Sequence, residues 1–224
     1  MHKSILKKIF CAALLVSAMI MPAANIATAA ELKAEVKDAA YESKWLNGTY
    51  PTVKLKNTAV GDRINEAIKA EVERFSLNLR SNYWLHRDQV GTISYRLTCN
   101  KKNALSFVLN EVYSPGKGAS KKVRARAMTF KLTDGKKITY DDVWSIINAL
   151  GKTRKFDREG LTELLYDQTR RAGVALYDEF PGTPYPPEDI YLDDKLRFHV
   201  IFQPGVVADE ATGPIDIDID EENW

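Results

Sequence analysis

Three β-rich segments follow one another between residues 93 and 132, and the short turns between them limit how the chain can fold. Four residues alternate with polar neighbours in the first segment, as in a half-buried strand: Ile93, Tyr95, Leu97 and Cys99. A polar turn over 100–103 leads into a second segment, 105–112, and this spacing is typical of a β-hairpin. A third strand is expected over 123–132, followed by the turn Thr133–Lys136 and a short strand around Ile138. The order predicts an antiparallel meander.

Helical periodicity flanks this region on both sides. From Val60 onward, five apolar residues share one helix face: Ile64, Ile68, Val72, Phe75 and Leu79. A second helix is expected from Asp141 to Gly151, and a third from about Asp157 to Glu179. The remainder returns to strands at 190–192, 196–203 and 215–219. The predicted fold class is α+β, an antiparallel sheet with helices packed on it.

The first 30 residues differ from the rest and are interpreted as a secretory signal peptide. They contain three lysines and no acid, an apolar run over 9–21, and small residues around Ala27-x-Ala29. The run is shorter than the roughly 20 residues that span a bilayer, although an uncleaved anchor is the alternative. Cys11 opens the run instead of ending it, which argues against a lipid anchor. The expected protein is exported, periplasmic or extracellular, and not membrane-spanning after cleavage.

The remaining chain has the size of one domain or two small ones. We expect an N-terminal extension over 31–46 and a single α+β domain over 47–224, with two subdomains of about 47–115 and 116–224 as the alternative. Without the three N-terminal lysines, 29 bases face 30 acids, so charge gives no reason to expect nucleic-acid binding. Cys99 is then the single cysteine, which excludes an internal disulfide and indicates a buried thiol.

Motifs that carry known chemistries are missing from the sequence. His86 and His199 have no cysteine or histidine at zinc-ligand spacing, and no nucleophile elbow, phosphate loop or H-E-x-x-H is present. Asp216, Asp218 and Asp220 alternate with isoleucines, so they occupy one face of a strand but lack the rest of a calcium loop. We interpret them as the polar face of a strand at a sheet edge. No catalytic residue, metal or cofactor is predicted, and the protein is expected not to be an enzyme.

Charged residues form two groups that either bind a partner or are simply solvated. The acidic group surrounds the proline-rich loop: Asp178, Glu179, Glu188, Asp189, Asp193 and Asp194. The basic group follows the second strand of the hairpin: Lys117, Lys121, Lys122, Arg124 and Arg126. Opposite potentials steer association, so an acidic patch would suit a cationic partner.

The C-terminal third contains an ordered series of short motifs. These are Asp189-Ile190-Tyr191-Leu192, the stretch from Leu196 to Phe202-Gln203-Pro204, and Gly213-Pro214-Ile215. The series resembles the end of a bacterial exported domain family of unknown function, which forms the outer part of lysozyme-binding anti-sigma factors. A related domain lies beside peptidoglycan deacetylase domains. Further short motifs extend the resemblance over most of 47–219: Tyr50-Pro51, Ile64-Asn65, Leu105 to Tyr113, and Thr133 to Val143.

The resemblance implies an envelope binding module whose partner is lysozyme, another exported protein or peptidoglycan. The ligand-binding residues it suggests lie in loops: Lys117, Ser120, Lys121, Asp193, Asp194, Gln203 and Pro204. Two positions depart from the family pattern, since Ser120 stands where the family has His and Gly205 where it has Tyr. The alternative function is a peptidoglycan hydrolase or deacetylase that uses Glu188 and Asp189, and a purely structural role is a third.

Overall fold

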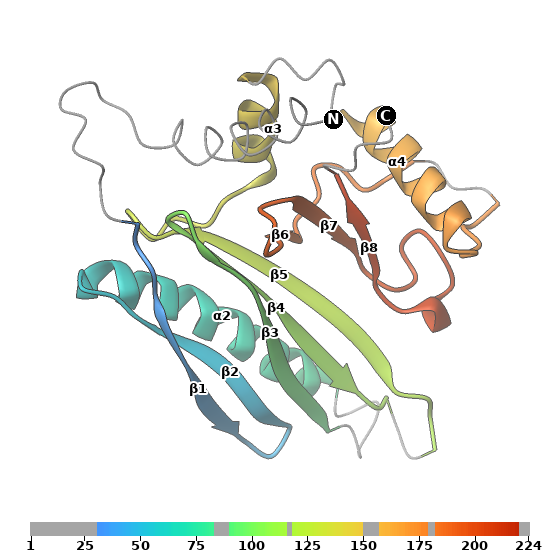
Figure 1. The fold of residues 1–224 in the computed structure, drawn as a ribbon. Coiled ribbons are helices and arrows are strands. Elements are labelled where there is room, and N and C mark those ends of the chain that lie inside the picture. Colours follow the sequence, from blue (N-terminus) through green and yellow to red (C-terminus); the bar gives the residue numbers. More distant parts are fainter. Residues whose placement is uncertain (1–30, 83–89, 116–117, 150–156, 179–181, 220–224) are drawn as a thin grey trace.

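The computed structural model describes residues 31–82, 90–115, 118–149, 157–178 and 182–219 (Figure 1). The expected signal peptide, His86, Lys117 and Asp220 lie outside the described residues. A large sheet has the strand order β1-β2-β3-β4-β5 and a small sheet the order β6-β7-β8. The strands of the large sheet are β1 (Glu35–Glu42), β2 (Leu46–Lys54), β3 (Gly91–Lys101), β4 (Ala104–Tyr113) and β5 (Lys122–Lys131). Those of the small sheet are β6 (Ile190–Leu192), β7 (Phe198–Phe202) and β8 (Ile215–Asp218). The helices are α2 (Thr58–Asn82), α3 (Tyr140–Ala149), α4 (Arg158–Arg171) and the short 3-10 turn η1 (Glu210–Thr212).

The predicted meander is confirmed as β3, β4 and β5, which pair in antiparallel fashion. Its first turn is tighter than expected, because β3 and β4 extend to Lys101 and Ala104 and leave two residues between them. Lys102 and Asn103 both have positive φ, 53° and 60°, as a type I′ hairpin turn requires. The short strand expected around Ile138 is reduced to one bridge between Phe130 and Lys137.

The α+β class is confirmed, but the large sheet is mixed instead of purely antiparallel. β2 and β3 run parallel, with Leu46 opposite Gly91. The physical reason is α2, which connects the two strands, because a helical crossover returns the chain to the same end of the sheet. β1 pairs along its length with β2, so the segment 31–46 contributes a strand to the sheet. The large sheet also continues past residue 115 into β5, across the boundary proposed between two subdomains.

Helix α2 covers one face of the large sheet (Figure 1). The predicted apolar face is confirmed, since all five of its residues are buried: Ile64, Ile68, Val72, Phe75 and Leu79. They pack against inward-facing residues of β3, β4 and β5, among them Phe107 and Phe130, whose rings stack at 5.9 Å. These residues form the hydrophobic core between α2 and the large sheet.

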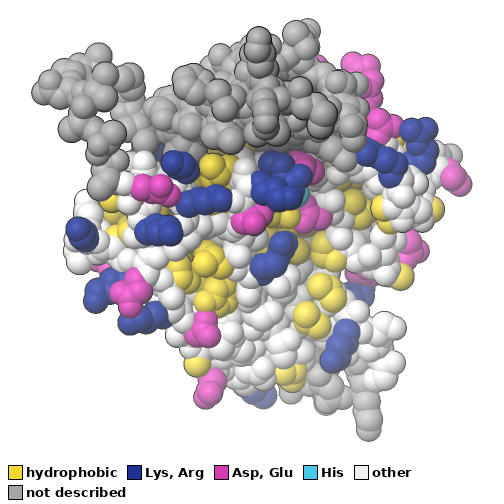
Figure 2. Space-filling model, viewed as in Figure 1, with side chains coloured by type: hydrophobic (Ala, Val, Ile, Leu, Met, Phe, Trp, Pro, Cys, Tyr) yellow, Lys and Arg dark blue, Asp and Glu magenta, His cyan; other side chains and the backbone are white. Residues whose placement is uncertain are grey.

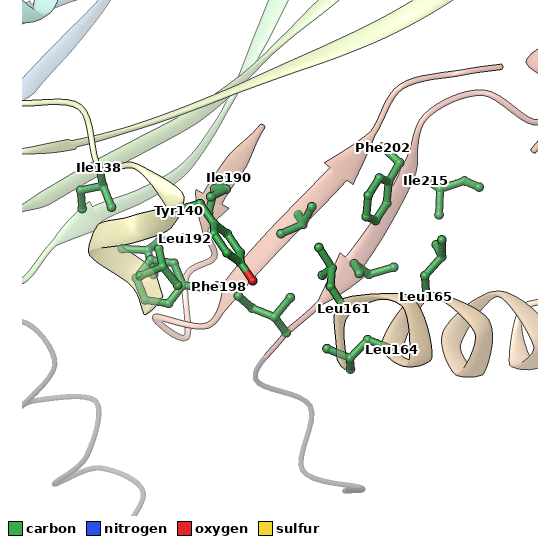
Figure 3. Packing of buried hydrophobic residues seen from close by; sticks show 14 of the residues in the cluster. Ile138, Tyr140, Leu161, Leu164, Leu165, Ile190, Leu192, Phe198, Phe202 and Ile215 are labelled. Atoms are coloured by element: carbon green, nitrogen blue, oxygen red, sulfur yellow. The ribbon is translucent and has the colours of Figure 1, made fainter. Parts of the chain in front are cut away.

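The small sheet packs on both of its faces. One face meets α3 and α4 in a second core, where Leu161 and Leu165 of α4 point toward the strands that carry Phe202 and Ile215 (Figure 3). The other face meets the side of β4 and β5 that lies opposite α2, where Tyr191 and Ile201 pack against Val108, Ala125 and Ala127 of the large sheet. Cys99 is buried in the second core, which confirms the expected buried thiol, and burial raises the pKa of that thiol.

Helix α4 is shorter than predicted and ends at Arg171 instead of about Glu179. Gly173 has φ 69°, its N–H donates to the carbonyl of Arg170, and the N–H of Val174 donates to that of Thr169. This pair of bonds is the Schellman motif, in which a left-handed glycine ends the helix. Leu176 therefore lies beyond the helix, in a bridge with Ala208.

Candidate functional site

Polar side chains gather on the face of the small sheet that meets the large one. The set, called the His199 cluster below, comprises Arg96, Tyr191, Asp193, Arg197, His199, Asp216 and Asp218. Alternation along β6, β7 and β8 places Tyr191, His199, Asp216 and Asp218 on one face, while their neighbours in these strands enter the core with α4. Arg96 reaches this face from β3 of the large sheet, and Asp193 and Arg197 from the turn between β6 and β7. Acidic and basic side chains lie next to one another on this side of the molecule (Figure 2).

His199 is the centre of this cluster. Its Nδ1 lies 3.1 Å from Asp216 Oδ1, its Nε2 lies 3.5 Å from Asp193 Oδ2, and its ring stacks on Tyr191 at 4.6 Å. Burial of the ring by itself lowers the pKa of His199, but the hydrogen bond with Asp216 and the three surrounding carboxylates outweigh it, so the pKa is raised. The cluster therefore favours the imidazolium form.

The aspartates of the cluster are held by hydrogen bonds from several sides. Asp216 accepts the Tyr191 hydroxyl at 2.5 Å, and Arg96 of β3 lies 3.9 Å from the same carboxylate oxygen. Arg197 joins Asp218 at 2.5 Å and Asp193 at 2.6 Å. Burial alone raises the pKa of Asp193, but hydrogen bonds from Arg197 and Lys195 lower it below its usual value. The cluster is a pre-ordered network that links three strands of the small sheet to β3.

An open groove runs along the outer side of β8, between this strand and the end of α4. We call it the β8 groove; its volume is about 520 Å³. Its walls are Gln168, Thr169, Arg171, Ala172 and Val174 on one side and Thr212 and Pro214–Asp218 on the other. Ligand sites in proteins commonly have volumes of about 300–1,000 Å³. Asp216 belongs both to this groove and to the His199 cluster.

Strand β8 is the end strand of the small sheet, as predicted for the polar strand face around Asp216 and Asp218. The N–H of Ile219 donates to the carbonyl of Phe198 on β7, so the backbone groups of alternate residues, Ile215, Ile217 and Ile219, face β7. The backbone groups of Asp216 and Asp218 therefore face the groove. Gln168 takes up both groups of Asp218: it donates to the carbonyl at 2.7 Å and accepts from the N–H at 3.0 Å.

The opposite edge of the small sheet, at β6, is closed by side chains of the large sheet. At the edge of β6, the Ser106 hydroxyl accepts the N–H of Leu192 at 3.0 Å, and Thr129 donates to the carbonyl of Ile190 at 3.1 Å. The edge of β5 is closed in return, because Gln203 bonds both backbone groups of Ala125 and Asp189 accepts the N–H of Ala127. Among the described residues, these contacts leave β8 as the edge strand of the small sheet that no other strand or loop covers.

A partly buried ionic network lies where α2 crosses β4 and β5. Asp189 accepts from Arg126 at 2.8 Å, Arg126 donates to Glu71 at 3.1 Å, and Glu71 pairs with Arg74 at 2.5 Å. Glu111 is 1% exposed and lies 3.5 Å from Arg74. Burial raises the pKa of Glu111 to about 7, because the arginines only partly compensate for the lost solvation. Because its hydrogen bonds join side chains of α2, β5 and the residue before β6, the network holds these three elements together.

The structure separates the residues predicted to bind a ligand into two groups. Ser120 and Lys121 are exposed in the β4–β5 loop, at the end where Lys122 pairs with Glu210. Asp193 and Asp194 lie at the opposite end, where the carbonyl of Asp194 accepts from Lys101. β4 and β5 have ten residues each, so the two groups are on the order of 30 Å apart.

Several predicted residues already have bonds within the protein. Gln203 bonds the backbone of Ala125 and also donates to Asp189 at 2.7 Å. Pro204 follows it and is half-buried. Of the pair proposed for hydrolysis, Glu188 is 81% exposed, whereas Asp189 is buried and bonded to Arg126, Ala127 and Gln203. Through these bonds Asp189 holds the start of β6 against β5.

Two residues were not predicted from the sequence: Gln168, which lines the groove, and Arg96, which belongs to the His199 cluster. Gln168 lies 50 residues before Asp218 in an ordinary helical pattern, and Arg96 lies on a different sheet from Tyr191. One signal was present: the alternating acids of β8 predicted an edge strand. Nothing in the spacing indicated that α4 would stand beside that edge.

Neither a metal site nor a membrane-spanning helix is found among the described residues. Within it, His, Cys, Asp and Glu side chains nowhere gather in a group of three that could hold a metal ion. Among the same residues, no helix is both long and apolar enough to cross a membrane.

Comparison with known proteins identifies the fold. No protein-family model matches the chain, and no curated protein matches it. Among solved structures, a member of the DUF3298 family from Bacteroides fragilis has a TM-score of 0.53 at 14% identity, over 84% of this chain and 90% of that one. A DUF3298 family protein from Pseudomonas aeruginosa has a TM-score of 0.46 at 10% identity, with the same coverage. The first of these likenesses shows that the chain shares the fold of a protein of the DUF3298 family, a domain family of unknown function.

Proposed function

We propose that the chain is an exported, non-enzymatic binding module of the cell envelope whose ligand occupies the β8 groove. The observation that supports this function is the open edge of β8 at Asp216, which faces a groove of about 520 Å³ beside a pre-ordered polar cluster. Backbone groups at an open sheet edge bind a partner with little rearrangement. The polar cluster holds the edge rigidly, and rigidity reduces the entropy that binding costs.

Export is proposed from the N-terminal segment, with its lysines, short apolar run and small residues before Ala30. The protein then meets its ligand in the periplasm or outside the cell. Three ligands suit that location and the resemblance of the sequence: lysozyme, another exported protein, and peptidoglycan.

The first experiment is calorimetric titration of the purified protein with lysozyme, accompanied by co-sedimentation with peptidoglycan. Binding at micromolar affinity or tighter is expected for one of the two, and it should weaken at raised salt if charges contribute. The variant Asp216→Lys replaces a negative charge at the groove with a positive one, which repels a cationic ligand such as lysozyme. We expect it to weaken binding at least tenfold. Glu73→Lys is the matched control, since Glu73 is exposed on α2, on the other side of the large sheet.

Two results would contradict the proposal. Equal binding by wild type and Asp216→Lys would remove the β8 groove from the function. Turnover of peptidoglycan by the protein, lost in Glu188→Gln, would favour the hydrolase or deacetylase alternative instead.

A further inference from the structure

The outer edge of β8 borders the β8 groove, and no strand among the described residues pairs with this edge. We infer that the ligand includes an extended polypeptide segment of a separate protein, which adds to β8 as a fourth strand of the small sheet and takes the place of the Gln168 amide. The inference rests on the proposed function and specifies the class of ligand, a polypeptide rather than a glycan.

Hydrogen bonding along β8 supports this mode of binding. Residues 215, 217 and 219 face β7, and residues 216 and 218 face the groove. The described residues supply no recorded hydrogen bond to the N–H or C=O of Asp216. A strand residue placed opposite Asp216 would bond both groups, as in the hydrogen-bonded pairs of an antiparallel ladder. Pro214 has no N–H, so the added strand pairs with 216 and 218 and extends no further toward η1.

Gln168 already imitates a neighbouring strand at Asp218. Its side-chain amide offers one donor and one acceptor to the backbone of Asp218, at 2.7 Å and 3.0 Å, as a peptide group would. A ligand strand that reaches Asp218 must displace this amide, but it replaces both bonds with its own. Displacement therefore exchanges hydrogen bonds in equal number. The free-energy cost that remains is the loss of the two ordered bonds between Gln168 and Asp218, together with the ordering of the ligand.

The walls of the groove indicate the side chains of the ligand. The residue opposite Asp216 points to the same face as the Asp216 carboxylate, which is 39% exposed, and opposite charges across a strand pair are favourable. The ligand residues on either side of it point toward α4, where Ala172, Val174 and Ile215 line the groove. The pattern that fits is a basic residue between two apolar ones.

Charge also argues against a second copy of this chain as the occupant. Two β8 strands paired around a twofold axis would bring Asp216 and Asp218 of one copy against the same acids of the other. Like charges directly opposite each other destabilise a strand pair. A separate polypeptide with the basic–apolar alternation avoids this repulsion.

The test uses a fluorescein-labelled peptide, Thr-Ser-Val-Lys-Val-Ser-Thr with blocked ends, titrated with the purified protein and followed by fluorescence anisotropy. Methylation of the lysine backbone nitrogen removes the donor to the carbonyl of Asp216, and we expect at least a tenfold loss of affinity. Methylation of the preceding valine nitrogen is the control, because in an added strand that N–H points away from β8. Gln168→Ala should bind the unmodified peptide several-fold more tightly, since no amide must be displaced.

Both methylated peptides are tested on the wild-type protein, so the comparison does not depend on the folding of a variant. Equal affinity of the two methylated peptides, or no binding of the unmodified one, would overturn strand addition. Unchanged or weaker binding by Gln168→Ala would overturn the displacement of its amide. The proposed function is judged separately, because binding of lysozyme or peptidoglycan lost in Asp216→Lys would support it even where strand addition fails.

Discussion

Two titratable side chains, the half-buried His199 and the buried Glu111, have raised pKa values for different reasons. At His199 the surrounding carboxylates overcome the effect of burial, and the charged form is favoured. At Glu111 burial outweighs the nearby arginines, and the neutral form is favoured. In both cases the folded protein holds its proton more strongly than the unfolded chain, so both groups make the protein less stable as the pH rises.

His199→Gln should reduce the dependence of stability on pH above about pH 6.5. The folded pKa lies above the unfolded value, so the stabilisation from His199 is complete below the unfolded pKa and is lost as the pH rises through the folded pKa. Urea unfolding at a series of pH values from 5.5 to 8.5 measures it. A slope equal to that of wild type would contradict the charge assignment of the ring. His199→Phe, which keeps the stacking on Tyr191, separates the charge from the ring contact.

Glu111→Gln should stabilise the protein at pH 8 and change little at pH 5. A shift of the pKa from 4.5 to about 7 corresponds to a cost of about 3 kcal/mol once the buried carboxyl is ionised. The neutral amide avoids that cost, and Arg74 keeps its partner Glu71. Urea unfolding at the two pH values is the measurement, with Glu73→Gln as an exposed control. Destabilisation at pH 8 would show that the ion pair with Arg74 outweighs burial.

Two glycines allow local structures that another residue would disturb: the close pairing of β2 with β3 and the end of α4. Gly48 lies on β2 against β3 with φ 136°, and a Cβ added there would be 1.9 Å from the carbonyl oxygen of Ile93. Gly173 ends α4 with φ 69°, and a Cβ added there has nothing within 4 Å. One glycine is required by the close approach of two strands, the other by backbone conformation alone.

Gly48→Ala and Gly173→Ala should therefore differ sharply in stability. For Gly173→Ala we expect a loss of about 1–2 kcal/mol, the strain of a left-handed alanine. For Gly48→Ala the clash with backbone adds to the strain and forces β2 and β3 apart, so the loss should exceed that of Gly173→Ala by about 2 kcal/mol or more. Free energies of unfolding from urea titrations decide the order. Similar losses of stability in the two variants would mean that β2 and β3 can move apart at Gly48 with little cost in free energy.

At the scale of the whole molecule, the two sheets are joined by polar side chains that close each other's edges. Asp189 is central, because its carboxylate accepts from the Ala127 N–H, Arg126 and Gln203. Apolar contact adds to this, with Tyr191 and Ile201 packed on Val108, Ala125 and Ala127. We therefore expect the two sheets to unfold as a single cooperative unit.

Asp189→Ala should destabilise the whole protein by about 3–5 kcal/mol, since it removes the acceptor of three hydrogen bonds: from the half-buried Arg126, from Gln203 and from the buried N–H of Ala127. Thermal unfolding followed by circular dichroism gives the loss, and near-ultraviolet and far-ultraviolet signals should change together. Glu188→Ala is the neighbouring control; its side chain is 81% exposed, so a change within about 0.5 kcal/mol is expected. Two separate transitions in wild type would mean that the sheets fold independently.

Local residue patterns were enough to predict most helices and strands, and also the position of β8 at an edge of its sheet. The face of α2 and the order of β3, β4 and β5 follow from residue periodicity, because neighbours in the chain decide which side chains can share a face. The edge position of β8 also follows, since alternating acids suit a strand with one open side. The predicted ligand-binding loops did not come together, because the distance between Ser120 and Asp194 depends on how strands pair.

The arrangement that supports a function comes from contacts between distant parts of the chain. Gln168 meets Asp218 across 50 residues, Ser106 meets Leu192 across 86, and Asp189 meets Ala127 across 62. Periodicity carries no information about such pairs, because a polar residue has the same pattern whether it closes a sheet edge or faces solvent. The chain's periodicity therefore accounts for its helices and strands, whereas the packing of α4 and the two sheets leaves Asp216 facing the groove.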